Sequence, residues 1–208
     1  MEVHRPRGPF SSFKDFVVEI ATIVVGVLIA LSFEGLREWN HNRTLAREAR
    51  DTIIRELTDN KKAVDGDLRN LPTRKKHLDE ALQFADDILK SGKTAMHTIE
   101  IRAAFNDLSM ASWQTAEHTG ALGQMSYAEV QKYAAVYALQ EIYQTQERRS
   151  MEHVSSATAA LAGGDPTRLP RTDIDRFRAQ LLTLRADLLV EEQLGRQLSE
   201  RYAKALQQ

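Results

Sequence analysis

The chain contains 208 residues, with 28 basic and 29 acidic side chains, so its formal net charge is only -1. This balance excludes the overall positive field that is typical of nucleic-acid-binding domains, and we expect no nucleic-acid partner. The absence of cysteine excludes disulfides, thiolate catalysis and cysteine-ligated zinc. Glycine and proline are few, at 10 and 5 residues, and this composition favours helix.

One apolar segment near the N-terminus, from Phe16 to Phe33, differs from the charged remainder of the chain. As a helix, its roughly 18 residues would measure ~27 Å, close to the roughly 30 Å hydrocarbon thickness of a bilayer. We therefore predict a short tail over 1–15 and a transmembrane anchor over 16–36. The alternatives are a cleaved signal peptide and a buried soluble helix. Glu19 interrupts the apolar run, which argues against the first, and the segment lacks a polar face, which argues against the second.

One face of the predicted anchor carries Glu19, Thr22, Gly26 and Ala30, which follow one another at intervals of three or four residues. Gly26 and Ala30 form a small-x-x-x-small pair, a spacing that lets two helix backbones approach closely in a membrane. Ionisable groups within a membrane segment usually face protein or water rather than lipid. These residues therefore predict a helix-association face. The alternative is a lipid-exposed helix whose Glu19 reaches the headgroups.

The remainder of the chain, 37–208, is predicted to form a bundle, so the fold class is all-α. We expect a single N-terminal transmembrane helix that continues into an antiparallel bundle of about four or five helices. The anchor helix should continue to Pro72 and break there. A second helix is expected over 72–90, followed by an irregular segment over 98–122.

Two further helices are expected in the C-terminal half. A capping box formed by Ser126 and Glu129 predicts the start of a helix that extends to about Leu161. After a GGDP loop, residues 172–175 are expected to cap the last helix. Its apolar stripe alternates spacings of three and four, which predicts a coiled-coil-like seam interrupted by one acid and one glycine. The stripe comprises Ile174, Phe177, Leu181, Leu184, Leu188, Glu191, Gly195, Leu198 and Tyr202.

No catalytic, cofactor or metal constellation emerges from the sequence, and we expect that the protein is not an enzyme. The Glu38 to His41 pair has the E-x-x-H spacing of helical di-iron sites, but no second such motif is present. The least generic soluble segment contains Trp113, Glu117 and His118, which could line a small pocket. The alternative is a short packed helix whose tryptophan fills the core.

The anchor sequence EIATIVVGVLIAL, Glu19 to Leu31, followed by Trp39, resembles a group of uncharacterised bacterial single-pass membrane proteins. The later W-x-T-A-x-x-x-G-A-L stretch, from Trp113 to Leu122, is similar to part of the same pattern. The resemblance implies a bacterial inner-membrane protein with a helical domain. It implies no activity that could be assigned to any residue.

These observations favour a membrane-anchored interaction or scaffolding protein that contacts the lipid bilayer and forms a homo-oligomer or binds another membrane protein. A ligand-sensing helical domain that signals through a separate partner is the alternative. Because a short basic tail before an anchor usually stays inside, we expect a periplasmic soluble domain, with a cytoplasmic one as the alternative.

Overall fold

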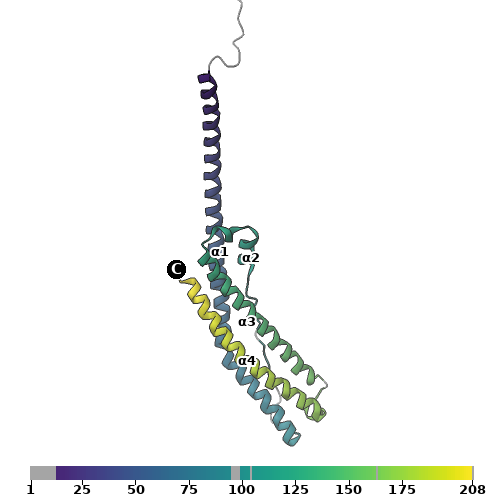
Figure 1. Ribbon diagram of the computed structural model, residues 1–208. Coiled ribbons are helices and arrows are strands. Elements are labelled where there is room, and N and C mark those ends of the chain that lie inside the picture. The colour runs from purple at the N-terminus through teal and green to yellow at the C-terminus, as the bar shows by residue number, and fades with distance from the viewer. Residues whose placement is uncertain (1–12, 95–98, 104, 163, 208) are drawn as a thin grey trace, which may run out of the picture. The chain divides into compact units, whose positions relative to one another are not determined.

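A computed structural model describes residues 13–94, 99–103, 105–162 and 164–207. The chain forms two compact units, 1–48 and 49–208, which are described separately below. All secondary structure in the described residues is helical, which confirms the all-α prediction (Figure 1). The elements are α1 (Phe13–Ser91), α2 (Ala111–His118), the 3-10 turn η1 (Ala121–Gln124), α3 (Tyr127–Ala160), the 3-10 turn η2 (Pro166–Arg168) and α4 (Arg171–Leu206). The tail predicted over 1–15 lies largely outside the described residues.

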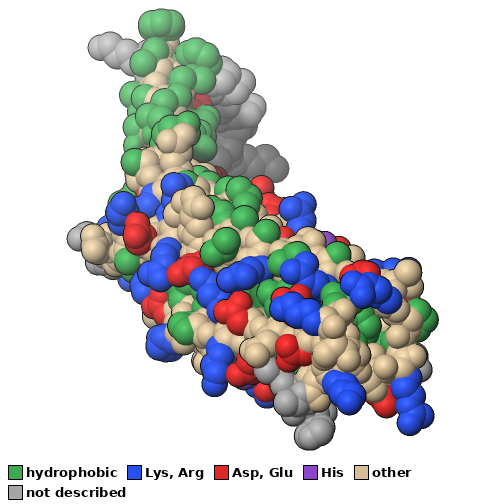
Figure 2. Space-filling model, turned by 90° about the horizontal axis from the view of Figure 1, so that it is seen from below, with side chains coloured by type: hydrophobic (Ala, Val, Ile, Leu, Met, Phe, Trp, Pro, Cys, Tyr) green, Lys and Arg blue, Asp and Glu red, His purple; other side chains and the backbone are tan. Residues whose placement is uncertain are grey.

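In the first unit, the described part is the N-terminal stretch of α1, whose residues 16–33 are mostly apolar and all exposed. Among the described helices, α1 alone is long and apolar enough to cross a membrane. None of its most apolar segment is buried (Figure 2). The hydroxyls of Thr22 and Ser32 donate to the carbonyls of Val18 and Leu28, at 2.8 and 2.7 Å. These bonds satisfy the two hydroxyls within the helix itself, as an apolar environment requires.

In the second unit, the C-terminal half of α1 packs with α3 and α4 into a bundle. Two hydrogen bonds show how α1 and α3 run. Glu56 accepts from the Tyr137 hydroxyl, and further along both helices Asp67 accepts from the Tyr143 hydroxyl. These two helices are therefore parallel. Contacts from α1 to α4 run in opposite directions, as shown by Arg74 with Glu191 and Asp86 with Arg178. The bundle is confirmed, but α4 alone among its three long helices is antiparallel to its neighbours.

Helix α1 does not break at Pro72, so this prediction was wrong. Proline removes one backbone donor and disturbs the preceding turn, at about 3 kcal/mol in a helix interior. Leu71 and Leu78 lie on either side of it, and both are buried in one hydrophobic core with α4 residues. This packing holds the helix on both sides of the proline. The segment predicted as a second helix over 72–90 is therefore part of α1.

The continuous α1 explains why α3 is parallel to it. Without a turn at Pro72, α1 reaches the far end of the bundle at Ser91. The chain then returns along the bundle through residues 99–110, where the described residues form no helix (Figure 1). Helix starts again only at Ala111, so the irregular segment predicted over 98–122 is mostly a return connection.

The two C-terminal helices begin differently. The Oγ of Ser126 accepts from the N–H of Glu129 at 3.3 Å, which confirms the Ser126 half of the predicted capping box. The Glu129 carboxylate pairs with Arg50 of α1. Helix α4 begins at Arg171 after Pro170, with no side-chain cap, so the cap predicted over 172–175 was wrong. Pro170 has the fixed φ of a proline and an extended ψ, which suit the residue that precedes a helix. Its carbonyl accepts a hydrogen bond from the N–H of Asp173. Residues 172–175 therefore form the first turn.

The predicted seam of α4 is confirmed along its whole length. All nine of its residues, from Ile174 to Tyr202, are buried. The glycine that interrupts the seam has a packing role, because a Cβ at Gly195 would lie 3.2 Å from side-chain atoms of both Leu68 and Tyr143. The acid that interrupts the seam, Glu191, is only 1% exposed, and its partners form the site described next.

Candidate functional site

Four charged side chains meet in the centre of the bundle, and we call them the buried cluster: Asp67 and Arg74 of α1, Glu147 of α3 and Glu191 of α4. Each is less than a tenth exposed. Arg74 Nη1 donates to Asp67 Oδ1 at 3.0 Å and to Glu191 Oε1 at 2.5 Å. One guanidinium therefore bridges carboxylates from two helices. Buried charges in proteins are usually paired in this way, because leaving one unpaired is strongly unfavourable.

Neutral donors satisfy the remaining oxygens of the cluster. Asp67 Oδ2 accepts from the Tyr143 hydroxyl at 2.9 Å, and Glu191 Oε2 accepts from the Ser150 hydroxyl at 3.0 Å. Glu147 Oε1 accepts from Asn106 Nδ2 at 2.9 Å. Asn106 belongs to the return connection, so Glu147 ties this connection to the middle of α3.

The three carboxylates have the spacing of a metal site, because one oxygen of each lies within 4.8 Å of the others. The residues do not fit a metal ion well, since the Arg74 guanidinium already supplies the cation between Asp67 and Glu191. A bound divalent ion would face this fixed positive charge at hydrogen-bonding distance. Two nitrogens of Arg74, Nε and Nη2, have no hydrogen-bond partner among the described residues.

The charge of the cluster is unbalanced, since three carboxylates face one guanidinium. Burial raises the pKa of Glu147 to about 7, and the two negative neighbours Glu191 and Asp67 add to this effect against the hydrogen bonds from Asn106. Burial also raises the pKa of Glu191, although its bond to Arg74 works in the opposite direction. Glu147 therefore retains its proton to a higher pH than a glutamate in water does.

A second polar layer lies nearer the start of α3. Glu56 accepts from the Tyr137 and Ser109 hydroxyls, both at 2.6 Å, and from the N–H of Ser112 at 2.9 Å. The last bond satisfies a backbone donor in the first turn of α2, which has no side-chain cap of its own. Glu56 therefore fixes both the end of the return connection and the start of α2.

The neighbouring amides extend this layer across all three long helices. Asn60 Nδ2 donates to Gln140 Oε1 at 3.1 Å, and the Tyr202 hydroxyl donates to the same oxygen at 2.6 Å. Gln140 is fully buried. Such a network is satisfied in one register of the helices, because sliding one helix past another would separate every pair.

The three residues of the predicted pocket all lie on α2. Trp113 is half-buried, and its ring centroid lies 5.3 Å from that of Tyr137. Glu117 and His118 are exposed, and His118 Nδ1 lies 2.7 Å from the carbonyl oxygen of Gln114. The tryptophan thus contacts the bundle, while the acid and the histidine face solvent. The four residues of the predicted association face, Glu19, Thr22, Gly26 and Ala30, are all exposed.

The chemistry of the buried cluster is that of a structural ion network. Glu147 and Glu191 are 0% and 1% exposed, so a substrate has no direct path to their carboxylates. The cluster can hold a proton, fix helix register and anchor the return connection. Sequence reasoning missed it, and its one visible sign was an acid in the apolar seam of α4.

Comparisons of this chain with protein-family models, with curated proteins and with solved structures found no match.

Proposed function

We propose that this chain is a single-pass, membrane-anchored interaction or scaffolding protein that self-associates through its anchor and is not an enzyme. In this proposal it resides in a bacterial inner membrane with its bundle in the periplasm. The exposed apolar helix supports anchorage, since so much exposed apolar surface is unfavourable in water. The closed polar core supports a structural rather than catalytic role for the bundle.

The observation that carries self-association is the exposed pair of small residues Gly26 and Ala30, which lie four residues apart on one face of the anchor. A Cβ at Gly26 would meet no atom within 4 Å, so packing among the described residues does not require a glycine there. Gly195 is different, because a Cβ there would press on two side chains. A glycine inside a helix is about 0.5–1 kcal/mol less favourable than alanine. Close approach of a second anchor helix would give Gly26 the role that Gly195 has within the bundle.

The same face carries groups that could bond across such an interface. Glu19 lies about two turns before Gly26 on the helix, and Thr22 about one turn before it. The Thr22 hydroxyl donates within its own helix, so its oxygen keeps a lone pair for an external donor. Interhelical hydrogen bonds in membranes contribute only ~0.6–2 kcal/mol each, so close packing is expected to be the larger contribution.

The mass of the full chain in a mild detergent tests self-association. We expect a dimer or larger particle for the wild type and a shift toward monomer for Gly26→Leu. Gly35→Leu is the matched control, because Gly35 also has open space around it and lies about half a turn around the helix from Gly26. A monomeric wild type, or equal effects of the two substitutions, would contradict the proposal.

The orientation has its own test. Protease added to intact spheroplasts should digest the bundle if it lies in the periplasm. A bundle that survives until the membrane is lysed would make it cytoplasmic.

A further inference from the structure

The carboxylate of Glu147 lies under the return connection. Its Oε1 accepts from Asn106 Nδ2 at 2.9 Å, and its Oε2 accepts from the backbone N–H of Asn106 at 3.4 Å. Residues 105–107 form no helix, and the two neighbours of Asn106, Phe105 and Asp107, are exposed. We call these three residues the Asn106 latch. A fully buried acid is therefore held at both of its oxygens by one residue of a surface segment.

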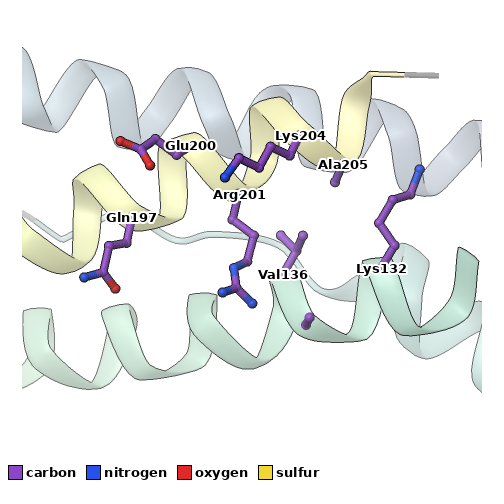
Figure 3. A pocket seen from close by; sticks show the side chains of 8 residues that line it. Lys132, Val136, Gln197, Glu200, Arg201, Lys204 and Ala205 are labelled. Carbon is purple, nitrogen blue, oxygen red and sulfur yellow. The ribbon is translucent and has the colours of Figure 1, made fainter. Parts of the chain in front are cut away.

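A surface groove between α3 and α4 does not reach this acid. It is lined by side chains such as Lys132, Val136 and Arg201, and no member of the buried cluster is among them (Figure 3). In Figure 3 the Arg201 side chain points from α4 toward α3 across this groove. Water that enters at the Asn106 latch would disturb less packing, because this segment is not helical and two of its three side chains are already exposed.

The surroundings of Glu147 make its negative charge unfavourable. The titratable groups around it are Asp67 and Arg74 of α1, Tyr143 of α3, Glu191 and Tyr202 of α4 and the exposed Asp107 of the return connection, and Arg74 is the one cation in this set. The Arg74 guanidinium is already bonded to Asp67 and Glu191. Burial raises the pKa of Glu147 to about 7, even though the two hydrogen bonds from Asn106 act in the opposite direction. These bonds therefore do not compensate for the water that the carboxylate has lost.

From this geometry we propose that the Asn106 latch is controlled by a proton: it is closed while Glu147 carries its proton and opens to water when that proton passes to the solvent. In the open state water surrounds the carboxylate, so its pKa returns toward the ordinary 4.5. All residues of this device belong to the bundle unit, so it does not depend on the anchorage proposed above.

The two pKa values determine how strongly the pH acts on the opening of the latch. A state that binds the proton less tightly becomes more populated as the pH rises. With a pKa of 4.5 in the open state and about 7 in the closed state, the equilibrium constant for opening increases roughly 70-fold between about pH 5 and about pH 8. The increase levels off above about pH 8, because Glu147 is then ionised in both states.

The test is amide hydrogen exchange of the full chain in a nonionic detergent, with fragmentation that resolves single residues. The N–H of Asn106 is the reporter, because it donates to Glu147 itself. Its protection factor, which is corrected for the intrinsic pH dependence of exchange, should fall roughly 70-fold between about pH 5 and about pH 8. The N–H of Ser109, which donates to Asn60 at 3.0 Å, should keep its protection. Glu147→Gln should abolish the pH dependence at Asn106, whereas Glu152→Gln, an exposed change on the same helix, should not.

Three outcomes would overturn the proposal. One is a protection factor at Asn106 that does not change with pH in the wild type. Another is an equal fall at Asn106 and Ser109, which would assign the opening to the whole connection or to global unfolding. A third is an equal pH dependence in the wild type and in Glu147→Gln, which would assign the proton to another group such as Glu191. If Glu147→Gln does not fold, the comparison of Asn106 with Ser109 in the wild type still decides.

Discussion

Replacing Glu147 with glutamine should remove much of the pH dependence of the bundle's stability. Glu147 is 0% exposed, and burial raises its pKa from an ordinary 4.5 to about 7. The folded protein therefore keeps this proton to a higher pH than the unfolded chain does. The stability contributed by this group is fully present below pH 4.5 and is lost as the pH rises through 7.

The magnitude follows from these two values. The difference between 4.5 and 7, at about 1.4 kcal/mol for each pH unit, corresponds to roughly 3 kcal/mol in total. Of this, about 2.5 kcal/mol falls between about pH 5 and about pH 8. Glutamine has no titrating proton, and its Oε1 can still accept from Asn106. Asp67, Arg74 and Glu191, which face this position from α1 and α4, are present in both proteins and contribute to both curves.

The assay is urea unfolding of the full chain in a nonionic detergent at a series of pH values. In a Trp39→Phe background, Trp113 fluorescence reports the bundle, because this ring packs near Tyr137. The free energy of unfolding of the wild type should fall with rising pH relative to Glu147→Gln. Glu117→Gln, an exposed acid-to-amide control, should follow the wild type. Parallel curves for wild type and Glu147→Gln would refute the reasoning.

Three further substitutions test other parts of the account by the same unfolding assay. Arg74→Met should destabilise the bundle by roughly 3–5 kcal/mol, because it leaves Asp67 and Glu191 buried without their shared cation; a loss below about 1 kcal/mol would contradict the importance of this bridge. Gly195→Ala should destabilise by about 1–3 kcal/mol, because the new Cβ presses on Leu68 and Tyr143, and a neutral effect would show that both side chains adjust freely. Ser126→Ala should destabilise by ~1 kcal/mol through loss of the α3 cap, whereas Thr172→Ala, which removes no cap, should leave stability nearly unchanged.

The sequence predicts this fold best where periodicity and burial coincide. In α4, the three-four alternation identified a stripe that is buried from Ile174 to Tyr202. At Ser126, the cap follows from local chemistry between residues three apart, so it was also predictable. Pro72 shows the limit of such local rules. Its effect on α1 depends on Leu71 and Leu78 packing against a helix about a hundred residues away.

The buried cluster was largely hidden from sequence reasoning for a related reason. Asp67, Arg74 and Glu147 belong to charged helices in which most such residues are exposed, and nothing in their spacing marks them as buried. Their contacts require the register of α1, α3 and α4, which the sequence does not reveal. Glu191 alone gave a sign, because an acid within an apolar seam requires a partner when it is buried. The identity of that partner, Arg74, became evident only from the fold.

The central proposal, association through the Gly26 face of the anchor, can be tested directly by cysteine crosslinking in native membranes. The chain has no cysteine, so a single introduced thiol is the only one present. Ala30 lies on the proposed face, and Leu28 lies about 200° around the helix from it. We predict that Ala30→Cys forms a disulfide-linked dimer on mild oxidation and that Leu28→Cys does not. Equal crosslinking at the two positions, or none at either, would contradict the proposal.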